Sequence, residues 1–328
     1  MAERASAAPE CRFDPPADLA ALPKAEVHVH LEGTIRPATL DAMARREGLQ
    51  VPRAFTDLRS FIDVMSGAWA AMAQPGDYAR LVREYCEDAA RAGVRYAELE
   101  LVPIGRAHDV LGEAVAAAAR ETELVVRFVA GVTRNLPIEL AWMTLDAVRD
   151  HPEVVAIGLG GDEAGYPAEL FAELFAEARR RGLPAAPHAG EDAGPTSVRA
   201  ALDALGAARI QHGVRAIETP DLVAELVARG IPLAVCPTSN VRLGVVASLE
   251  AHPLRALAAA GVRLSVNTDD PGFFNCDLLG EYAIAGRLLG LDREGYARLA
   301  ASSVESSFAP APLKRELGAA IAAWRDRR

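Results

Sequence analysis

The chain has 328 residues, of which 51% are hydrophobic and 24% are charged, proportions typical of a folded globular protein. Its formal net charge is -10 and its pI is about 5.3, whereas a nucleic-acid-binding domain usually presents a basic face. No run of 18 apolar residues suggests a transmembrane helix, and the N-terminus lacks the apolar core of a secretory signal. We therefore expect a cytoplasmic protein that binds neither nucleic acid nor membrane.

Residues 1–20 are rich in Ala and Pro and are predicted to form a flexible tail ahead of a single domain over 21–328. Runs of strand composition then alternate with Ala- and Leu-rich helical segments. The predicted strands cover residues 26–30, 94–101, 124–133, 153–159, 184–188, 208–212, 231–236 and 262–267. Such alternation predicts an α/β fold with a parallel sheet. Eight units favour a closed (β/α)8 TIM barrel over an open sheet.

The interval between the first two predicted strands, about sixty residues, is too long for a single helix and predicts a helical insertion after strand 1. Segments 37–48 and 78–92 have helical character. Between them, four apolar side chains recur at helical spacing: Phe61, Met65, Trp69 and Met72. The spacing favours a helix that faces the core, and an apolar lid over the barrel mouth is the alternative.

Metal-capable side chains end four of the predicted strands: His28 and His30, His188, His212, and Asp269 with Asp270. The two residues of the first pair are two apart, so both side chains point to the same side of the strand, here the barrel interior. Active sites of TIM barrels lie at the C-terminal ends of the strands. We therefore expect these groups to meet in one site.

Three imidazoles and one carboxylate suit a catalytic zinc ion, which keeps an open position for water. Zinc lowers the pKa of bound water from 15.7 to about 7, and we predict one ion per chain. Nearby, Glu191 could protonate a basic atom of the substrate. His212 could orient the water and take its proton, and Asp270 could accept a hydrogen bond from a ring N–H or steady the hydroxide.

Other polar residues favour structural interpretations. Glu98 and Glu100 face the same side of the second predicted strand, and Arg134 at the end of the third is a candidate cationic partner. The four cysteines are far apart and are predicted to be free thiols.

Five segments resemble the signature motifs of the adenosine deaminase family: His28-Val-His-Leu-Glu-Gly-Thr34, His188-Ala-Gly-Glu191, His212-Gly213, Cys236-Pro-Thr-Ser-Asn240 and Asn267-Thr-Asp-Asp-Pro271. The resemblance runs from about residue 22 to 307 in the same order. It implies zinc held by His28, His30, His188 and Asp269. It further implies that Glu191 protonates N1 of a purine, that His212 polarises the water, and that Asp270 contacts N7. Gly161 resembles the residue whose backbone N–H binds N3.

Glu32 stands where adenosine-specific members of this family usually have Asp, and is similar in this respect to adenine and aminodeoxyfutalosine deaminases. Gly161-Asp162-Glu163 and the motif at 236–240 look more like the nucleoside-acting members. The combination favours a 6-aminopurine nucleoside, aminodeoxyfutalosine of menaquinone biosynthesis or adenosine, over free adenine. Alternatively, Glu32 merely fills the place of the shorter residue.

Two other functions remain open at this level, and so does the oligomeric state. One is a different metal-dependent amidohydrolase, although two-metal members often use a bridging Lys and no Lys ends a predicted strand. The other is a non-catalytic purine-binding barrel, although no expected metal ligand or acid is missing.

Overall fold

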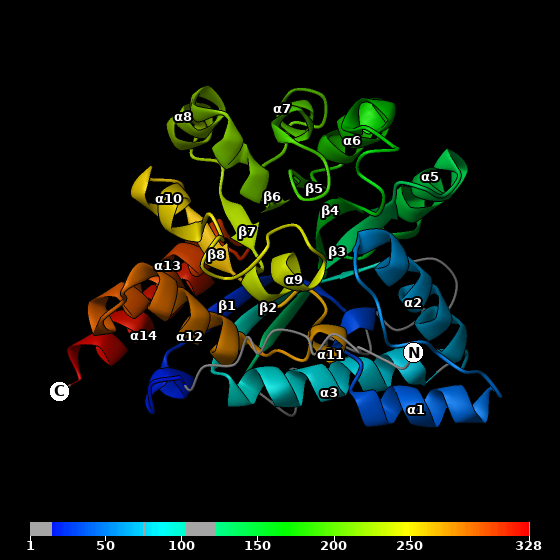
Figure 1. Ribbon diagram of the computed structural model, residues 1–328, viewed down its shortest axis with the longest axis horizontal. Helices are drawn as coiled ribbons and strands as arrows, with labels where there is room; N and C mark the ends of the chain where they lie inside the picture. The colour runs from blue at the N-terminus through cyan, green and yellow to red at the C-terminus, as the bar shows by residue number, and fades with distance from the viewer. Residues whose placement is uncertain (1–14, 75, 103–122, 328) are drawn as a thin grey trace, which may run out of the picture.

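A computed structural model describes residues 15–74, 76–102 and 123–327, and its strands form one barrel surrounded by helices (Figure 1). Within this part of the chain the strands follow the order β1 to β8, and each is parallel to the next. Their bounds are β1 Lys24–His30, β2 Val94–Leu101, β3 Val125–Thr133, β4 Val154–Gly160, β5 Ala185–Ala189, β6 Ile210–His212, β7 Leu233–Val235 and β8 Leu264–Val266. The predicted (β/α)8 fold is confirmed.

The barrel closes where the segment after β8 meets β1. The His30 amide donates to the carbonyl of Asp269 at 2.8 Å, and the Asp269 amide donates to the carbonyl of His28 at 3.2 Å. The last three strands contain only three residues each and are shorter than predicted. Each begins two residues later than predicted, and β7 and β8 also end one residue earlier.

Helices form the outer ring of the barrel (Figure 1). Their bounds are α1 Pro37–Arg46, α2 Leu58–Ala71, α3 Asp77–Arg91, α5 Ile138–Ala147, α6 Ala172–Arg180, α7 Pro195–Asp203, α8 Pro220–Arg229, α9 Pro237–Arg242, α10 Leu254–Ala259, α11 Pro271–Phe274, α12 Leu278–Leu289, α13 Arg293–Ser306 and α14 Ala311–Asp326. Pro at the first turn starts α7 and α8, where its missing N–H costs nothing. Gly230 ends α8 in the left-handed conformation. Among the described helices, none is long and apolar enough to cross a membrane.

The insertion after β1 contains α1, α2 and α3, as predicted. Both interpretations of the apolar stripe apply to α2, the middle helix of this insertion. Phe61 and Met65 are buried, whereas Trp69 is 37% exposed, and all three line a cavity at the mouth of the barrel. The helix thus packs on the core and covers the cavity with the same face.

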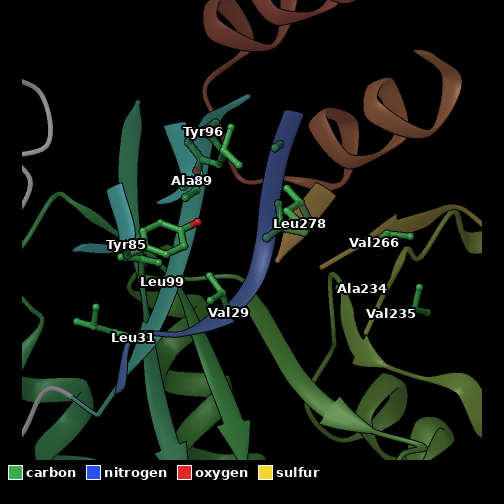
Figure 2. Close-up of a cluster of buried hydrophobic side chains, with 14 of the residues drawn as sticks. Val29, Leu31, Tyr85, Ala89, Tyr96, Leu99, Ala234, Val235, Val266 and Leu278 are labelled. Carbon is green, nitrogen blue, oxygen red and sulfur yellow. The ribbon is translucent and has the colours of Figure 1, made fainter. Parts of the chain in front are cut away.

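Apolar side chains fill the space between the barrel and α3. Figure 2 shows Val29 of β1 and Leu99 of β2 in one cluster with Tyr85 and Ala89 of α3. All four are buried, and burial of such side chains stabilises the fold by about 25 cal/mol per Å² of apolar surface. This packing fixes the position of β1, which carries two of the expected metal ligands.

Residues that precede β1 also pack against the barrel. Residues 1–14 lie outside the described part, but Leu19 is fully buried in the short helix Leu19–Ala21. The carbonyls of Leu19, Leu22 and Ala92 accept hydrogen bonds from the ammonium group of Lys24, and burial lowers the pKa of that group to about 7. The buried side chains of Leu19 and Leu22 thus pack this end of the described chain against the barrel.

The cysteine prediction holds for Cys86, Cys236 and Cys276, which form no disulfide. Cys11 lies outside the described residues.

The buried ion pair inside the barrel contains a different arginine from the one predicted. Glu98 pairs with Arg209, not with Arg134, at 2.7 Å between Oε2 and Nη1, and both side chains are fully buried. Arg209 also donates to the carbonyl of Val27. Arg134 instead donates to the carbonyls of Tyr166 and His188. Arg209 thus ties β2 to β1 and the start of β6 below the rim.

Removing this buried cation should destabilise the fold. The variant Arg209→Met leaves Glu98 as an unpaired buried carboxylate, and we expect a loss of about 3–5 kcal/mol in the free energy of unfolding. Arg229→Met is a matched control, because Arg229 pairs with Glu225 on the surface of α8 and should change stability by less than about 0.5 kcal/mol. Urea unfolding curves for the two variants check this, and equal midpoints would contradict it.

Candidate active site

The expected site residues meet at one cavity of about 180 Å³ in the mouth of the barrel. Its polar floor is lined by His30, Glu32, Glu100, Gly161, His188, Glu191, His212, Asp269 and Asp270. His28 lies directly beneath, fully buried at the centre of the cluster. Its outer wall is apolar and includes Leu58, Phe61, Ile62, Met65, Trp69 and Leu136. The cavity can therefore hold a ligand with a polar inner part and an apolar outer contact.

Four contacts among the candidate ligand atoms of His28, His30, His188 and Asp269 are close to the separations found between the ligands of a zinc ion. Nε2 of His188 is 3.1 Å from Nε2 of His28 and 3.2 Å from Nε2 of His30. Oδ1 of Asp269 is 3.4 Å from Nε2 of His28 and 3.3 Å from Nε2 of His30. Ligands bonded to zinc at about 2.0–2.2 Å in a tetrahedron lie about 3.3–3.5 Å apart. These residues therefore fit a zinc ion.

Hydrogen bonds on the far side of these ligands orient them toward the centre. Nδ1 of His28 is 3.1 Å from the carbonyl of Ala234, and Nδ1 of His188 is 3.1 Å from the carbonyl of Leu159. Each Nδ1 therefore carries the hydrogen and leaves the Nε2 lone pair free for a metal. Ser239 donates to Oδ2 of Asp269 at 2.6 Å, which leaves Oδ1 facing the histidines.

His212 also forms a possible donor set with His28, His188 and Asp269, and the candidate atoms of these four residues all lie within 4.8 Å of one another, whereas His30 shares such groups with His188 and with Asp269 separately. Nε2 of His212 is 3.8 Å from Oδ2 of Asp269 and 3.4 Å from Oε1 of Glu191. These contacts are longer than those made by His30. We therefore place His212 beside the zinc ligands and not among them.

Two rim residues adopt backbone conformations that side chains other than glycine rarely adopt. His212 has φ 57° and Asp269 has φ 65°. Such conformations cost on the order of 1–3 kcal/mol each and cluster at functional sites. Here they turn both side chains from the short strands β6 and β8 into the cavity.

Glu191 is held at the cavity by a second carboxylate. Glu163 accepts hydrogen bonds from the amides of Gly190, Glu191, Asp192 and Ala193. The Oε1 atom of Glu191 is buried and has no hydrogen-bond partner among the described residues. Burial and the charges of Asp269 and Glu163 raise the pKa of Glu191 well above its ordinary value. A protonated carboxyl group is thus presented to the cavity.

Asp270 and Glu32 supply two more buried acids. Gly33 allows Asp270 to approach, because a Cβ atom at Gly33 would lie 1.9 Å from its Oδ1. Burial and the charge of Asp269 raise the pKa of Asp270, and burial raises the pKa of Glu32 to about 7. For Asp269 itself, burial is outweighed by hydrogen bonds with His28 and His30, which hold its pKa well below the ordinary value. The surroundings thus favour the ionised form of Asp269 and shift Asp270 and Glu32 toward their protonated forms.

Gly161 and Glu100 complete the floor. Gly161 has φ 96°, and a Cβ atom there would lie 2.6 Å from Oδ1 of Asn135, so only glycine fits this turn. Glu100 lines the cavity, in contrast to the structural role expected for it, and Gly158 on β4 makes room for its carboxylate.

Sequence reasoning missed several residues that position this site. Glu163 and Ser239 lie within motifs already noted, but nothing in one sequence indicates which group each contacts. The same is true of Asn240: it lies in a noted motif, but the sequence does not indicate that its amide contacts His212. Arg134 was assigned to another partner, and His252 has no motif around it that would have singled it out.

Known proteins resemble this chain over nearly its whole length. The family model described as adenosine deaminase matches residues 23–324. The chain is 39% identical to an aminodeoxyfutalosine deaminase of Streptomyces coelicolor, covering 96% of this chain and 89% of that protein. It is 38% identical to an adenine deaminase of Rhodospirillum rubrum, covering 94% and 98%.

A solved structure is similar over the same range. An amidohydrolase of Burkholderia ambifaria with bound zinc superimposes with a TM-score of 0.86 at 26% identity, covering 96% of this chain and 94% of that one. The match of fold, motif order and sequence spans nearly the whole chain, and the chain therefore belongs to the adenosine deaminase family.

Proposed function

We propose that the protein is a zinc-dependent enzyme that hydrolyses the 6-amino group of a purine and releases ammonia. The observation that carries the proposal is the cluster of three imidazole nitrogens and one carboxylate oxygen, with contacts of 3.1–3.4 Å, beside the unpartnered Oε1 of Glu191. His28, His30, His188 and Asp269 would hold one zinc ion. When bound, zinc supplies Lewis-acid activation of water at neutral pH.

The residues around the ion have roles that follow from their protonation. Glu191, neutral because it is buried, donates its proton to N1 of the ring, which withdraws electron density from C6 and favours attack by water. Asp270, also neutral, donates a hydrogen bond to N7. The amide of Gly161 donates to N3. These three contacts fix the ring so that C6 faces the metal side of the cavity.

The cavity supports a substrate without a phosphate group. Among the described residues that line it, none is Lys or Arg, whereas phosphate recognition relies on such cations or on helix N-termini. The apolar wall formed by α2 leaves contact surface beyond the purine ring. We therefore favour a nucleoside, aminodeoxyfutalosine or adenosine, and keep free adenine as the second candidate because of the relative that acts as an adenine deaminase.

We propose that Glu32 contacts the group attached to the purine and so contributes to substrate selection. We expect Glu32→Asp to shift the ratio of nucleoside to free-base kcat/KM toward adenosine by at least about tenfold, because a shortened buried carboxyl leaves a polar partner unsatisfied. The assay follows the ultraviolet loss of adenine, adenosine, deoxyadenosine, aminodeoxyfutalosine and AMP. Glu139→Asp, on an exposed turn of α5, is the control and should leave the ratio unchanged.

The same assay tests the proposed function in the unaltered protein. We expect AMP to react at least about a hundredfold more slowly than the best nucleoside. A protein that deaminates none of the five compounds would overturn the proposal. An unchanged ratio in Glu32→Asp would remove Glu32 from substrate recognition.

A further inference from the structure

Two buried side chains form a hydrogen-bonded line that leads to His212 from outside the cavity. His252 precedes α10 and Asn240 lies in α9, and both are buried. Nε2 of His252 is 3.1 Å from Oδ1 of Asn240, and Nδ2 of Asn240 is 3.1 Å from Nδ1 of His212. The opposite ring atom of His212, Nε2, faces the cavity 3.4 Å from Oε1 of Glu191. The line therefore connects α10 with the catalytic floor.

The direction of the hydrogen bonds is fixed at the outer end. The amide of Leu254, the first residue of α10, donates to Nδ1 of His252 at 3.1 Å. This amide is one of the helix N-terminal donors that have no partner within the helix. A backbone N–H can only donate, so Nδ1 of His252 must accept. Burial lowers the pKa of His252 to about 4, so the ring is neutral and its hydrogen is on Nε2.

The donor and acceptor roles at His252 also determine those of the Asn240 side-chain amide. Because Nε2–H of His252 donates, the atom of Asn240 that faces it must be the carbonyl oxygen. The amide NH2 of Asn240 then faces His212 and donates to Nδ1. The reversed amide would place two donors against each other at the outer contact. A neutral imidazole whose Nδ1 accepts carries its hydrogen on Nε2.

We propose that Asn240 and His252 are positioning residues that fix His212 in the Nε2–H tautomer, so that His212 donates a hydrogen bond into the cavity and does not take a proton there. The inference deepens the proposed function and rests on it. It replaces the expectation from sequence that His212 accepts the proton of the attacking water. In the donor state, His212 holds the oxygen that attacks C6 by donating to it. Both protons of the attacking water then leave without His212: one passes to the departing amino group, which is released as ammonia, and the other replaces the proton that Glu191 gave to N1.

The substitution Asn240→Asp tests the polarity directly. Asp has nearly the same shape, but an ionised carboxylate only accepts, so Nδ1 of His212 must then carry the hydrogen and Nε2 must lose it. NMR of the zinc-loaded protein labelled with 15N-histidine distinguishes the protonated from the unprotonated ring nitrogen. The His212 signals are identified by their loss in His212→Gln. We expect hydrogen on Nε2 in the unaltered protein and on Nδ1 in Asn240→Asp.

Turnover provides the second readout. If His212 must donate, Asn240→Asp should lower kcat by at least about tenfold, with KM and zinc content nearly unchanged. If His212 accepts the proton, the same substitution exposes a more basic Nε2 and kcat should be maintained or should rise. Maintained turnover together with the switched tautomer would therefore overturn the donor role.

Two substitutions at His252 provide an independent test in case the Asn240→Asp variant does not fold. Gln at 252 retains a donor toward Asn240, whereas Leu retains bulk without one. We expect His252→Gln to keep the Nε2–H signal of His212 and a kcat within about threefold, and His252→Leu to give mixed tautomers and a larger loss. The tautomer is measured without substrate, so it is independent of whether the proposed reaction is right. A hydrogen on Nδ1 in the unaltered protein, or equal behaviour of the two variants, would overturn the proposal.

Discussion

Replacing Glu191 by Gln is expected to lower kcat by two orders of magnitude or more while zinc content is kept. The change preserves the shape of the side chain but removes the acidic hydrogen that burial and neighbouring charges hold on it. General acid catalysis of this kind contributes about 10²–10⁴-fold. Because Glu191 is not among the four proposed ligands, the metal site should be intact.

Steady-state kinetics and elemental analysis of the same preparation check this expectation. Asp192→Asn is the matched control, since Asp192 is exposed on the same turn and its amide is held by Glu163 in the same way. The control should keep kcat within about twofold. Near-normal turnover in Glu191→Gln would assign the proton donation to another group.

Removal of the metal is the second large effect that we expect. Without an ion, three imidazole nitrogens and a carboxylate oxygen are left facing one another in a buried site. Chelation should reduce the deamination rate to below about one hundredth of that of the zinc-loaded protein. It should also lower the melting temperature. An ion that binds only the folded state stabilises it by about 4 kcal/mol at a thousand times its Kd.

Zinc titration into the chelated protein measures both consequences. One equivalent per chain should restore activity and thermal stability together. Restoration that requires two equivalents would indicate a two-metal site, and full activity in the metal-free protein would contradict the mechanism. Neither lysine supports a two-metal site, because Lys24 lies at the start of β1 and Lys314 lies in α14, both away from the cavity lining.

The barrel could be predicted because its signal is local. Each strand is a short apolar run and each helix has its own period, so alternation is visible along the chain without any knowledge of contacts. The lengths of β6, β7 and β8 were overestimated for a reason that is not local. Each begins two residues later than its apolar run, because pairing with the neighbouring strands decides where the ladder starts.

The residues of the candidate site could also be predicted, because each lies in a motif at a strand end. Their partners could not. Glu98 of β2 pairs with Arg209, which precedes β6, across the interior of the barrel. The order of the strands along the sequence does not specify which side chains meet there. The contact from His252 through Asn240 likewise depends on how α9 and α10 pack.

The central claim is that the chain catalyses hydrolysis at C6 of an aminopurine. The most direct measurement is a reaction of the zinc-loaded protein with its best aminopurine in water enriched in 18O, analysed by mass spectrometry and an ammonia assay. The account predicts one solvent-derived oxygen in each product molecule, one equivalent of ammonia, and at least about a hundredfold slower formation of both by Glu191→Gln. Product without solvent oxygen, or an aminopurine recovered unchanged from every reaction, would contradict it.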